Sequence, residues 1–168
     1  MKKIIKRVLV VLLIALIVIQ FFRPEKNLSQ GTNPYDISTK YPVPPNVQEA
    51  FKVACNDCHS DSSRYPWYWN IQPVAWFLNG HIEEGKRHLN FSEFTSYKIG
   101  RQYHTLEEIN NEIKEGDMPL GSYTLIHRDA ILTDEQKQAI ASWVATSRKQ
   151  IEANFPADSL VQPKWGQH

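Results

Sequence analysis

The chain has 168 residues, of which 42% are hydrophobic and 22% charged, and its formal net charge is +1. From residue 27 onward it carries 13 Lys and Arg against 17 Asp and Glu, a net charge of −4. This mildly acidic part of the chain gives no electrostatic basis for binding nucleic acid. The length after the N-terminal segment, about 140 residues, is enough for one domain with a hydrophobic core.

The first 22 residues form a basic and then apolar segment. Four of the first seven positions are Lys or Arg, and residues 8–22 include one polar residue, Gln20. Counted from Ile4, this stretch would span about 28 Å as a helix, close to the thickness of a bilayer core. A cleaved signal sequence shares the pattern but ends in small residues, which do not follow here. We therefore favour an uncleaved single-pass anchor, with the rest of the chain exported because the basic residues precede the span.

Three further regions follow from composition. Residues 23–45 contain five prolines and no periodic apolar pattern, which predicts a tether that lifts the domain off the membrane. Residues 46–151 are the predicted folded domain. Residues 152–168 are a predicted tail that either wraps the domain or is disordered, and Phe155 and Trp165 favour packing of part of it.

Three helices are predicted in the domain, each from a capping pair and an apolar stripe at helical spacing. The capping pairs are Asn46 with Glu49, Thr105 with Glu108, and Thr133 with Gln136. The stripes are Val47, Ala50, Phe51 and Ala54; Leu106, Ile109 and Ile113; and Ile140, Trp143, Val144 and Ile151. Gly116 suits the position after the second helix. Because no stretch alternates like a strand, the predicted class is all-α.

The first helix leads into Cys55-Asn56-Asp57-Cys58-His59. This reads C-x-x-C-H, the attachment motif of c-type haem. Two thiols three positions apart can add to the two vinyl groups of one porphyrin, and His59 then lies under the iron as its proximal ligand. The motif uses both cysteines of the chain. We therefore expect one covalently attached haem c.

Other interpretations of the two cysteines stay open. A thioredoxin-like redox pair requires a βαβ context, which the sequence does not show. A zinc site requires a second closely spaced ligand pair, and the remaining histidines are scattered. A plain disulfide between Cys55 and Cys58 is the third alternative.

Electron-transfer haem usually takes a second axial ligand, Met or His. Met118 is the first candidate because it follows the second predicted helix in the rigid loop Gly116-Asp117-Met118-Pro119. The alternative is that Met118 fills a gap in the core. His81 and then His127 are the competing ligands. Pro73 is a candidate to supply a carbonyl oxygen to the His59 ring N–H.

The order of a helix, C-x-x-C-H, further helices, a Met-Pro loop and a C-terminal helix resembles that of small class I cytochromes c. A closer resemblance, over about residues 41–144, is to the bacterial haem-binding domain family of membrane-anchored or secreted monohaem proteins. It rests on residues 55–60, 65–68, 71–76, His81, Gly85, residues 89–93, Met118-Pro119 and residues 123–127. The resemblance implies haem binding in a cytochrome c-like all-α domain around a covalent haem.

Ligation of iron by His59 and Met118 would raise the reduction potential and suit an electron carrier. We therefore expect an exported, membrane-tethered c-type cytochrome that exchanges single electrons with redox partner proteins on the periplasmic side of the inner membrane. We assign no catalytic residue, because no distal acid–base pair is recognisable. The alternatives are a haem-based sensor or a haem-binding subunit of a larger membrane complex, with bis-His or open iron, and a peroxidase-like enzyme.

Overall fold

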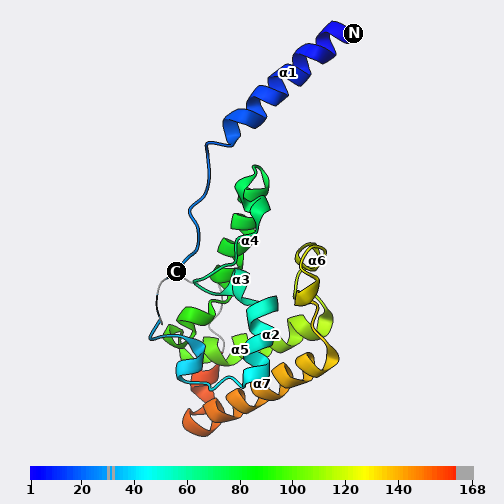
Figure 1. Cartoon of the computed structure of the whole chain (residues 1–168). Helices are drawn as coiled ribbons and strands as arrows, with labels where there is room; N and C mark the ends of the chain where they lie inside the picture. The colour runs from blue at the N-terminus through cyan, green and yellow to red at the C-terminus, as the bar shows by residue number, and fades with distance from the viewer. Residues whose placement is uncertain (30, 32, 162–168) are drawn as a thin grey trace.

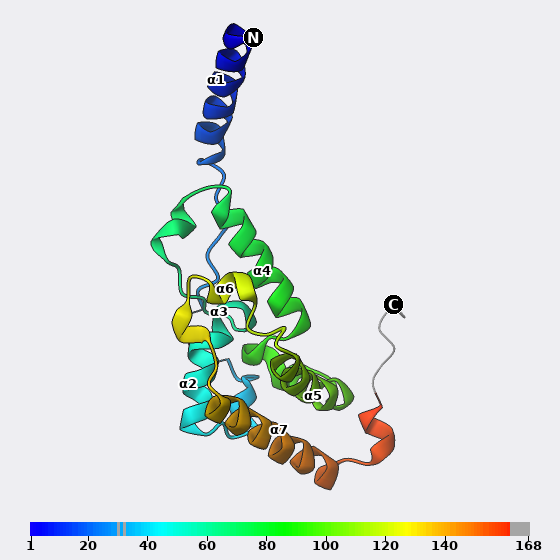
Figure 2. The same cartoon turned by 90° about the vertical axis from the view of Figure 1, so that its right-hand side faces the viewer.

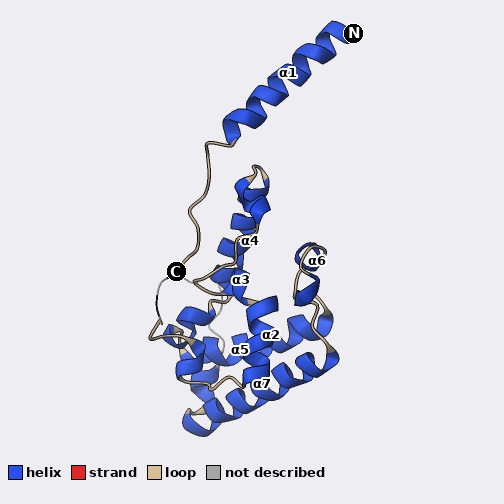
Figure 3. Cartoon of the chain, in the orientation of Figure 1, coloured by secondary structure: helices blue, strands red, loops and turns tan. Residues whose placement is uncertain are grey.

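The computed structural model describes residues 1–29, 31 and 33–161. These residues form helices joined by loops (Figures 1 and 3), and the β-type pairing among them is one isolated bridge between Leu28 and Ser62. The predicted all-α class is confirmed. Trp165, which was expected to help pack the tail, lies outside the described residues.

Helix α1 (Lys2–Ile19) projects away from the other helices (Figures 1 and 2). None of its residues is buried, and the exposed side chains include the apolar residues on every side of the helix. In the described part of the chain, no helix meets the length and apolarity needed to cross a membrane. The anchor expected at residues 1–22 therefore stays a prediction.

The main core lies between α2 (Pro45–Ala54), α5 (Ile99–Glu115) and α7 (Asp134–Asn154). Helix α7 packs against both of the other two. The predicted stripes are confirmed as core residues, with Ala54 partly buried. Phe51 and Trp143 meet edge to face, with ring centroids 5.3 Å apart, and this contact joins the helix before the C-x-x-C-H motif to the C-terminal helix.

The helix ends agree with the prediction in part. Thr133 and Gln136 form both bonds of a capping box at the start of α7, and Gly116 ends α5 in the left-handed conformation. The first predicted cap is wrong, because α2 begins one residue before Asn46, at Pro45, whose fixed φ suits a first helical position. The second is also wrong: Thr105 is buried inside α5, which starts at Ile99.

A fourth long helix, α4 (Val74–His88), was not predicted. Ala75, Leu78 and Ile82 follow helical spacing and pack with Trp69 in a second, smaller cluster. The stripe is short, so its periodic signal is weak. The other helices have at most six residues: η1 (Ile37–Thr39), α3 (Asn56–His59), η2 (Trp67–Asn70), η3 (Phe91–Ser96), α6 (Gly121–Thr124), η4 (Arg128–Ala130) and η5 (Ala157–Leu160).

The segment predicted as a free tether instead lies along the domain. Ile37 and Tyr41 are buried in the main core, and the Tyr41 hydroxyl donates to Gln102 Oε1 at 2.7 Å. Nearer to α1, Asn27 Nδ2 donates to the carbonyl oxygen of Ser60 at 2.8 Å. The prolines were interpreted as linker punctuation, but Ile37 and Tyr41 between them are core residues.

Candidate haem site

The C-x-x-C-H motif lies where the two hydrophobic clusters meet. Helix α3 follows α2 after Cys55. Cys55 packs against the main core, whereas Cys58 packs against the smaller cluster that includes Trp69 and residues of α4. Both thiols are free and partly buried, so the structure does not contain the disulfide considered above. Burial raises the pKa of Cys55 to about 12 and that of Cys58 to about 11. At neutral pH both groups are therefore protonated thiols.

The His59 ring is held by backbone carbonyls at the end of α4. Its Nδ1 lies 3.0 Å from the carbonyl oxygen of Leu89 and 3.1 Å from that of Gly85. Both partners are acceptors, so Nδ1 carries the proton and Nε2 keeps its lone pair. Burial lowers the pKa of His59, which favours the neutral imidazole that binds a metal ion.

Pro73 does not play the part predicted for it. Its carbonyl oxygen accepts from the backbone N–H of Phe77 in the first turn of α4. The ring of His59 uses the carbonyls of Gly85 and Leu89 instead, from the opposite end of that helix. A proline at a suitable sequence distance was therefore a misleading signal.

Gly85 allows α4 to lie directly on the motif. A Cβ atom at this position would be 2.8 Å from the backbone oxygen of Cys58 and 3.1 Å from its Cβ. No side chain fits at such a distance without a shift of the backbone. A glycine in the interior of a helix is the sequence signal for such a close approach. The role of Gly85 was not predicted from the sequence.

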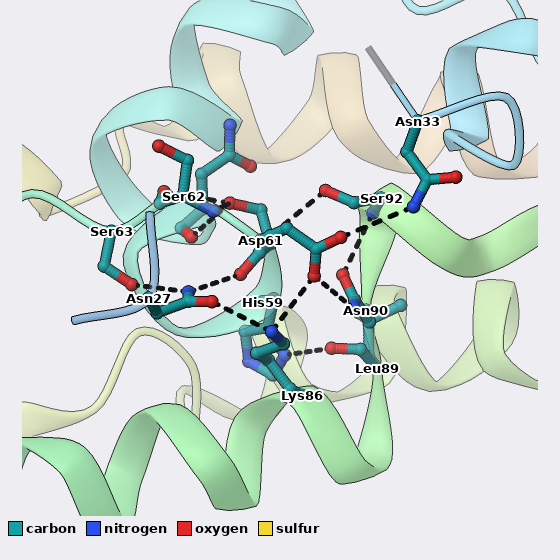
Figure 4. A network of polar contacts seen from close by, with 12 residues as sticks. Asn27, Asn33, His59, Asp61, Ser62, Ser63, Lys86, Leu89, Asn90 and Ser92 are labelled. Carbon is teal, nitrogen blue, oxygen red and sulfur yellow. Dashed lines mark hydrogen bonds and ion pairs between the residues drawn. The ribbon is translucent and has the colours of Figure 1, made fainter. Parts of the chain in front are cut away.

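A polar network supports the same side of His59 (Figure 4). Asp61 accepts from Lys86 Nζ at 3.0 Å and from Asn90 Nδ2 at 2.8 Å. Although partial burial opposes ionisation, these bonds outweigh it and lower the pKa of the Asp61 carboxyl. The network joins the loop after His59 to α4 and to the residue that follows Leu89. It therefore fixes the carbonyl that orients the imidazole.

A pocket lies next to Cys58 of the motif. Its apolar wall comes from η2, α4 and the residue before α6: Trp69, Phe77, Leu78, Ile82 and Leu120. Its polar wall comes from the motif, the segment after it, η2, α6 and the residue before η4: Asp57, Arg64, Tyr68, Tyr123 and His127. Haem also combines an apolar part with a polar part, because its apolar macrocycle carries two carboxylates. The residues present therefore fit the group that the motif predicts.

The polar wall is organised around Asp57. Its carboxylate accepts from the Tyr123 hydroxyl at 2.6 Å and from Arg64 Nε at 3.2 Å. The Tyr123 ring stacks on His127 with centroids 4.3 Å apart, and the Tyr68 hydroxyl lies 2.7 Å from His127 Nε2. Arg64 and Tyr68 are the donors on this wall that could bind a carboxylate. Asp57 and Arg64 were not predicted as site residues.

The structure separates the three candidates for the second axial ligand. His81 lines the pocket, and its Nε2 is buried without a hydrogen-bond partner among the described residues. His127 also lines the pocket, but its Nε2 is engaged by Tyr68. Met118 is absent from the pocket lining, although Leu120, two positions later, belongs to it.

Comparison with known proteins gives one match. The family model of the haem-binding domain matches residues 14–146. The chain belongs to the haem-binding domain family. No curated protein and no solved structure matches it. The match includes the motif, both walls of the pocket and all three candidates for the second ligand.

Within residues 1–29, 31 and 33–161, no three His, Cys, Asp or Glu side chains are grouped so that they could hold a metal ion. A zinc site at Cys55 and Cys58 would need such a group. The arrangement that is present consists of two thiols, an oriented imidazole and an amphiphilic pocket.

Proposed function

We propose that the domain carries one haem c, attached through Cys55 and Cys58 with His59 as the proximal iron ligand, and that it transfers single electrons. The orientation of His59 by the carbonyls of Gly85 and Leu89 carries this proposal. An imidazole that donates through Nδ1 presents Nε2 as a basic ligand in a fixed direction. Cys55 lies immediately before the short helix α3, and Cys58 lies in that helix next to His59.

The protein chain and the haem contribute different parts of the proposed function. Bound haem supplies the one-electron chemistry of its iron. The apolar wall, including Trp69 and Leu78, excludes water from the macrocycle, and a low dielectric favours the form of iron that carries less charge. Arg64 and Tyr68 on the polar wall can donate to carboxylates. No residue on either wall is needed as a nucleophile or general acid, so we propose a carrier and not an enzyme.

Met118 remains our proposal for the second axial ligand, because a thioether ligand raises the potential into the range of a respiratory carrier. A specific observation favours a second candidate. His81 lines the pocket, and its buried Nε2 has no hydrogen-bond partner within the part of the chain that the structure describes. As an iron ligand it would give a bis-His carrier of lower potential. If it does not bind the iron, it could bind a small molecule in the pocket, as in a haem-based sensor.

We further propose that α1 anchors the domain in the inner membrane, with the haem on the periplasmic side and redox proteins of the cell envelope as partners. Apolar residues exposed all around a helix support contact with lipid, and the basic residues before them support this orientation.

A potentiometric titration of the full chain, purified with haem, tests the carrier proposal. We expect one reversible one-electron transition and no binding of carbon monoxide by the reduced protein. Met118→Ala should lower the potential, whereas His81→Ala should leave it nearly unchanged. A potential that changes in His81→Ala and stays the same in Met118→Ala would make His81 the ligand. Rapid binding of carbon monoxide to the unaltered protein would contradict the carrier and favour the sensor.

A further inference from the structure

Large apolar side chains are exposed at the start of α4 and in the segment before it. The exposed fractions are 75% for Trp67, 44% for Ile71, 36% for Val74 and 44% for Trp76. We call these four residues the aromatic tip. A solvent-exposed cluster that includes two tryptophans is unfavourable in water and marks a surface that binds something.

The proposed haem site does not cover the aromatic tip. The pocket lining includes Phe77, the next residue along α4, but none of the four tip residues. Haem binding would therefore bury Phe77 and leave Trp67 and Trp76 where they are. A different occupant is needed for the tip.

The aromatic tip is joined to the end of α1. Gln20 Oε1 accepts from the backbone N–H of Gln72 at 2.9 Å, and Gln20 Nε2 donates to the Gln72 carbonyl at 3.2 Å. The Gln72 side chain donates in turn to the carbonyl oxygen of Phe22 at 2.6 Å. Gln72 is 1% exposed and lies between the tip residues Ile71 and Val74. In both views, the start of α4 is the part of the domain nearest to α1 (Figures 1 and 2).

We propose that the aromatic tip rests in the interfacial layer of the phospholipid bilayer that receives α1. This inference rests on the anchoring part of the proposed function. Tryptophan favours the headgroup layer, where its ring is in an apolar environment and its indole N–H reaches water. Ile71 and Val74 add apolar area between the two tryptophans. The hydrogen bonds between Gln20 and Gln72 then hold the domain with the start of α4 toward the membrane and α7 away from it.

Photocrosslinking in bilayers tests the proposal with the full-length protein carrying its haem. The protein is reconstituted in phosphatidylcholine vesicles that contain a phospholipid with a photoactivatable group near the headgroup. Crosslinked peptides are then mapped by mass spectrometry. We expect lipid adducts in α1 and on residues 67–76. Ile131 is the matched control: it is 52% exposed and apolar, and it comes three positions before α7, a helix that lies far from α1 (Figure 1). It should carry no adduct.

A double variant, Trp67→Ser with Trp76→Ser, should lose the tip adducts and keep those in α1. Its haem spectrum should not change, because neither residue lines the pocket, and this shows that the variant is folded. Adducts in α1 without any on residues 67–76 would overturn the tip proposal, leave the anchor intact and assign the tip to a protein partner. Adducts in neither segment would overturn the anchor and the tip together, while the haem proposal would be untouched.

Discussion

His59 Nδ1 lies 3.0 Å from the carbonyl oxygen of Leu89, thirty positions later in the chain. The contact connects the C-x-x-C-H motif to the end of α4, and it exists because two other features permit it. Gly85 lets the helix approach Cys58, and the Asp61 network holds the segment after the helix. The orientation of the proposed iron ligand is therefore built into the fold of the protein chain.

Gly85→Ala should destabilise the protein. The new methyl group would lie 2.8 Å from the backbone oxygen of Cys58, so α4 must move away from the motif. We expect a loss of about 1–3 kcal/mol in the free energy of unfolding by urea, as for other overpacked sites, and less haem bound per chain. Gly80→Ala is the control in the same helix. Its Cβ would meet nothing within 4 Å, and it should stabilise by roughly 0.5–1 kcal/mol. Equal effects of the two variants would contradict the close approach.

Asp57→Asn should also destabilise the protein, by about 1–3 kcal/mol, because the ion pair with Arg64 is lost and the partly buried Tyr123 hydroxyl loses a charged acceptor. The Asp57 side chain is 11% exposed. Asp129 is the matched control, since it lies 3.7 Å from the same guanidinium but is 56% exposed. Asp129→Asn should change stability by less than about 0.5 kcal/mol. Thermal unfolding of both variants checks this difference, which would vanish if Asp57 were an ordinary surface residue.

Asp61 should make the protein sensitive to acid. Its pKa is lower in the folded state than in the unfolded chain, so the unfolded state binds the proton more readily. The stabilisation is complete above the unfolded pKa, about 3.9, and is lost as the pH falls below it toward the folded pKa. Urea unfolding from pH 6 to pH 3 should therefore show a steeper fall for the unaltered protein than for Asp61→Asn. Parallel curves would show that Asp61 is not the acid-sensitive group.

Thr133→Ala should cost about 1 kcal/mol, because the Thr133 side chain accepts a bond at the start of α7. Asn46→Ala should change stability by less than about 0.5 kcal/mol. Asn46 is exposed within the first turn of α2, and that helix has no side-chain cap. Urea midpoints of the two variants distinguish a residue that makes a capping hydrogen bond from one that does not. An equal loss in both would restore the predicted start of the first helix at Asn46.

Features that depend on neighbouring residues could be predicted from the sequence, whereas features that depend on distant segments could not. The stripe from Ile140 to Ile151 and the Thr133 cap depend on residues within a few positions of each other, and both were predicted correctly. The partner of His59 depends on how α4 crosses the motif, and no local pattern reports that crossing. Ile37 and Tyr41 were missed for a similar reason: their burial is decided by distant helices and not by the prolines beside them.

The candidate site likewise contains residues that could be predicted from the sequence and residues that could not. The motif residues Cys55, Cys58 and His59 could be named from spacing alone, because the chemistry of haem attachment fixes it. The walls of the pocket could not, since Tyr123 reaches Asp57 from a segment 66 positions later in the chain. His81 could be named as a candidate, but the burial of its Nε2, which has no partner among residues 1–29, 31 and 33–161, follows only from the packing of α4.

The most direct test of the account is the intact mass of the full chain, expressed together with a haem c maturation system and measured under denaturing conditions. We predict the mass of the polypeptide plus one haem, and release of that haem into acidified organic solvent when Cys55 and Cys58 are both changed to Ser. A polypeptide that shows its bare mass, with all of its haem extracted by the solvent, would contradict covalent attachment and with it the proposed c-type cytochrome.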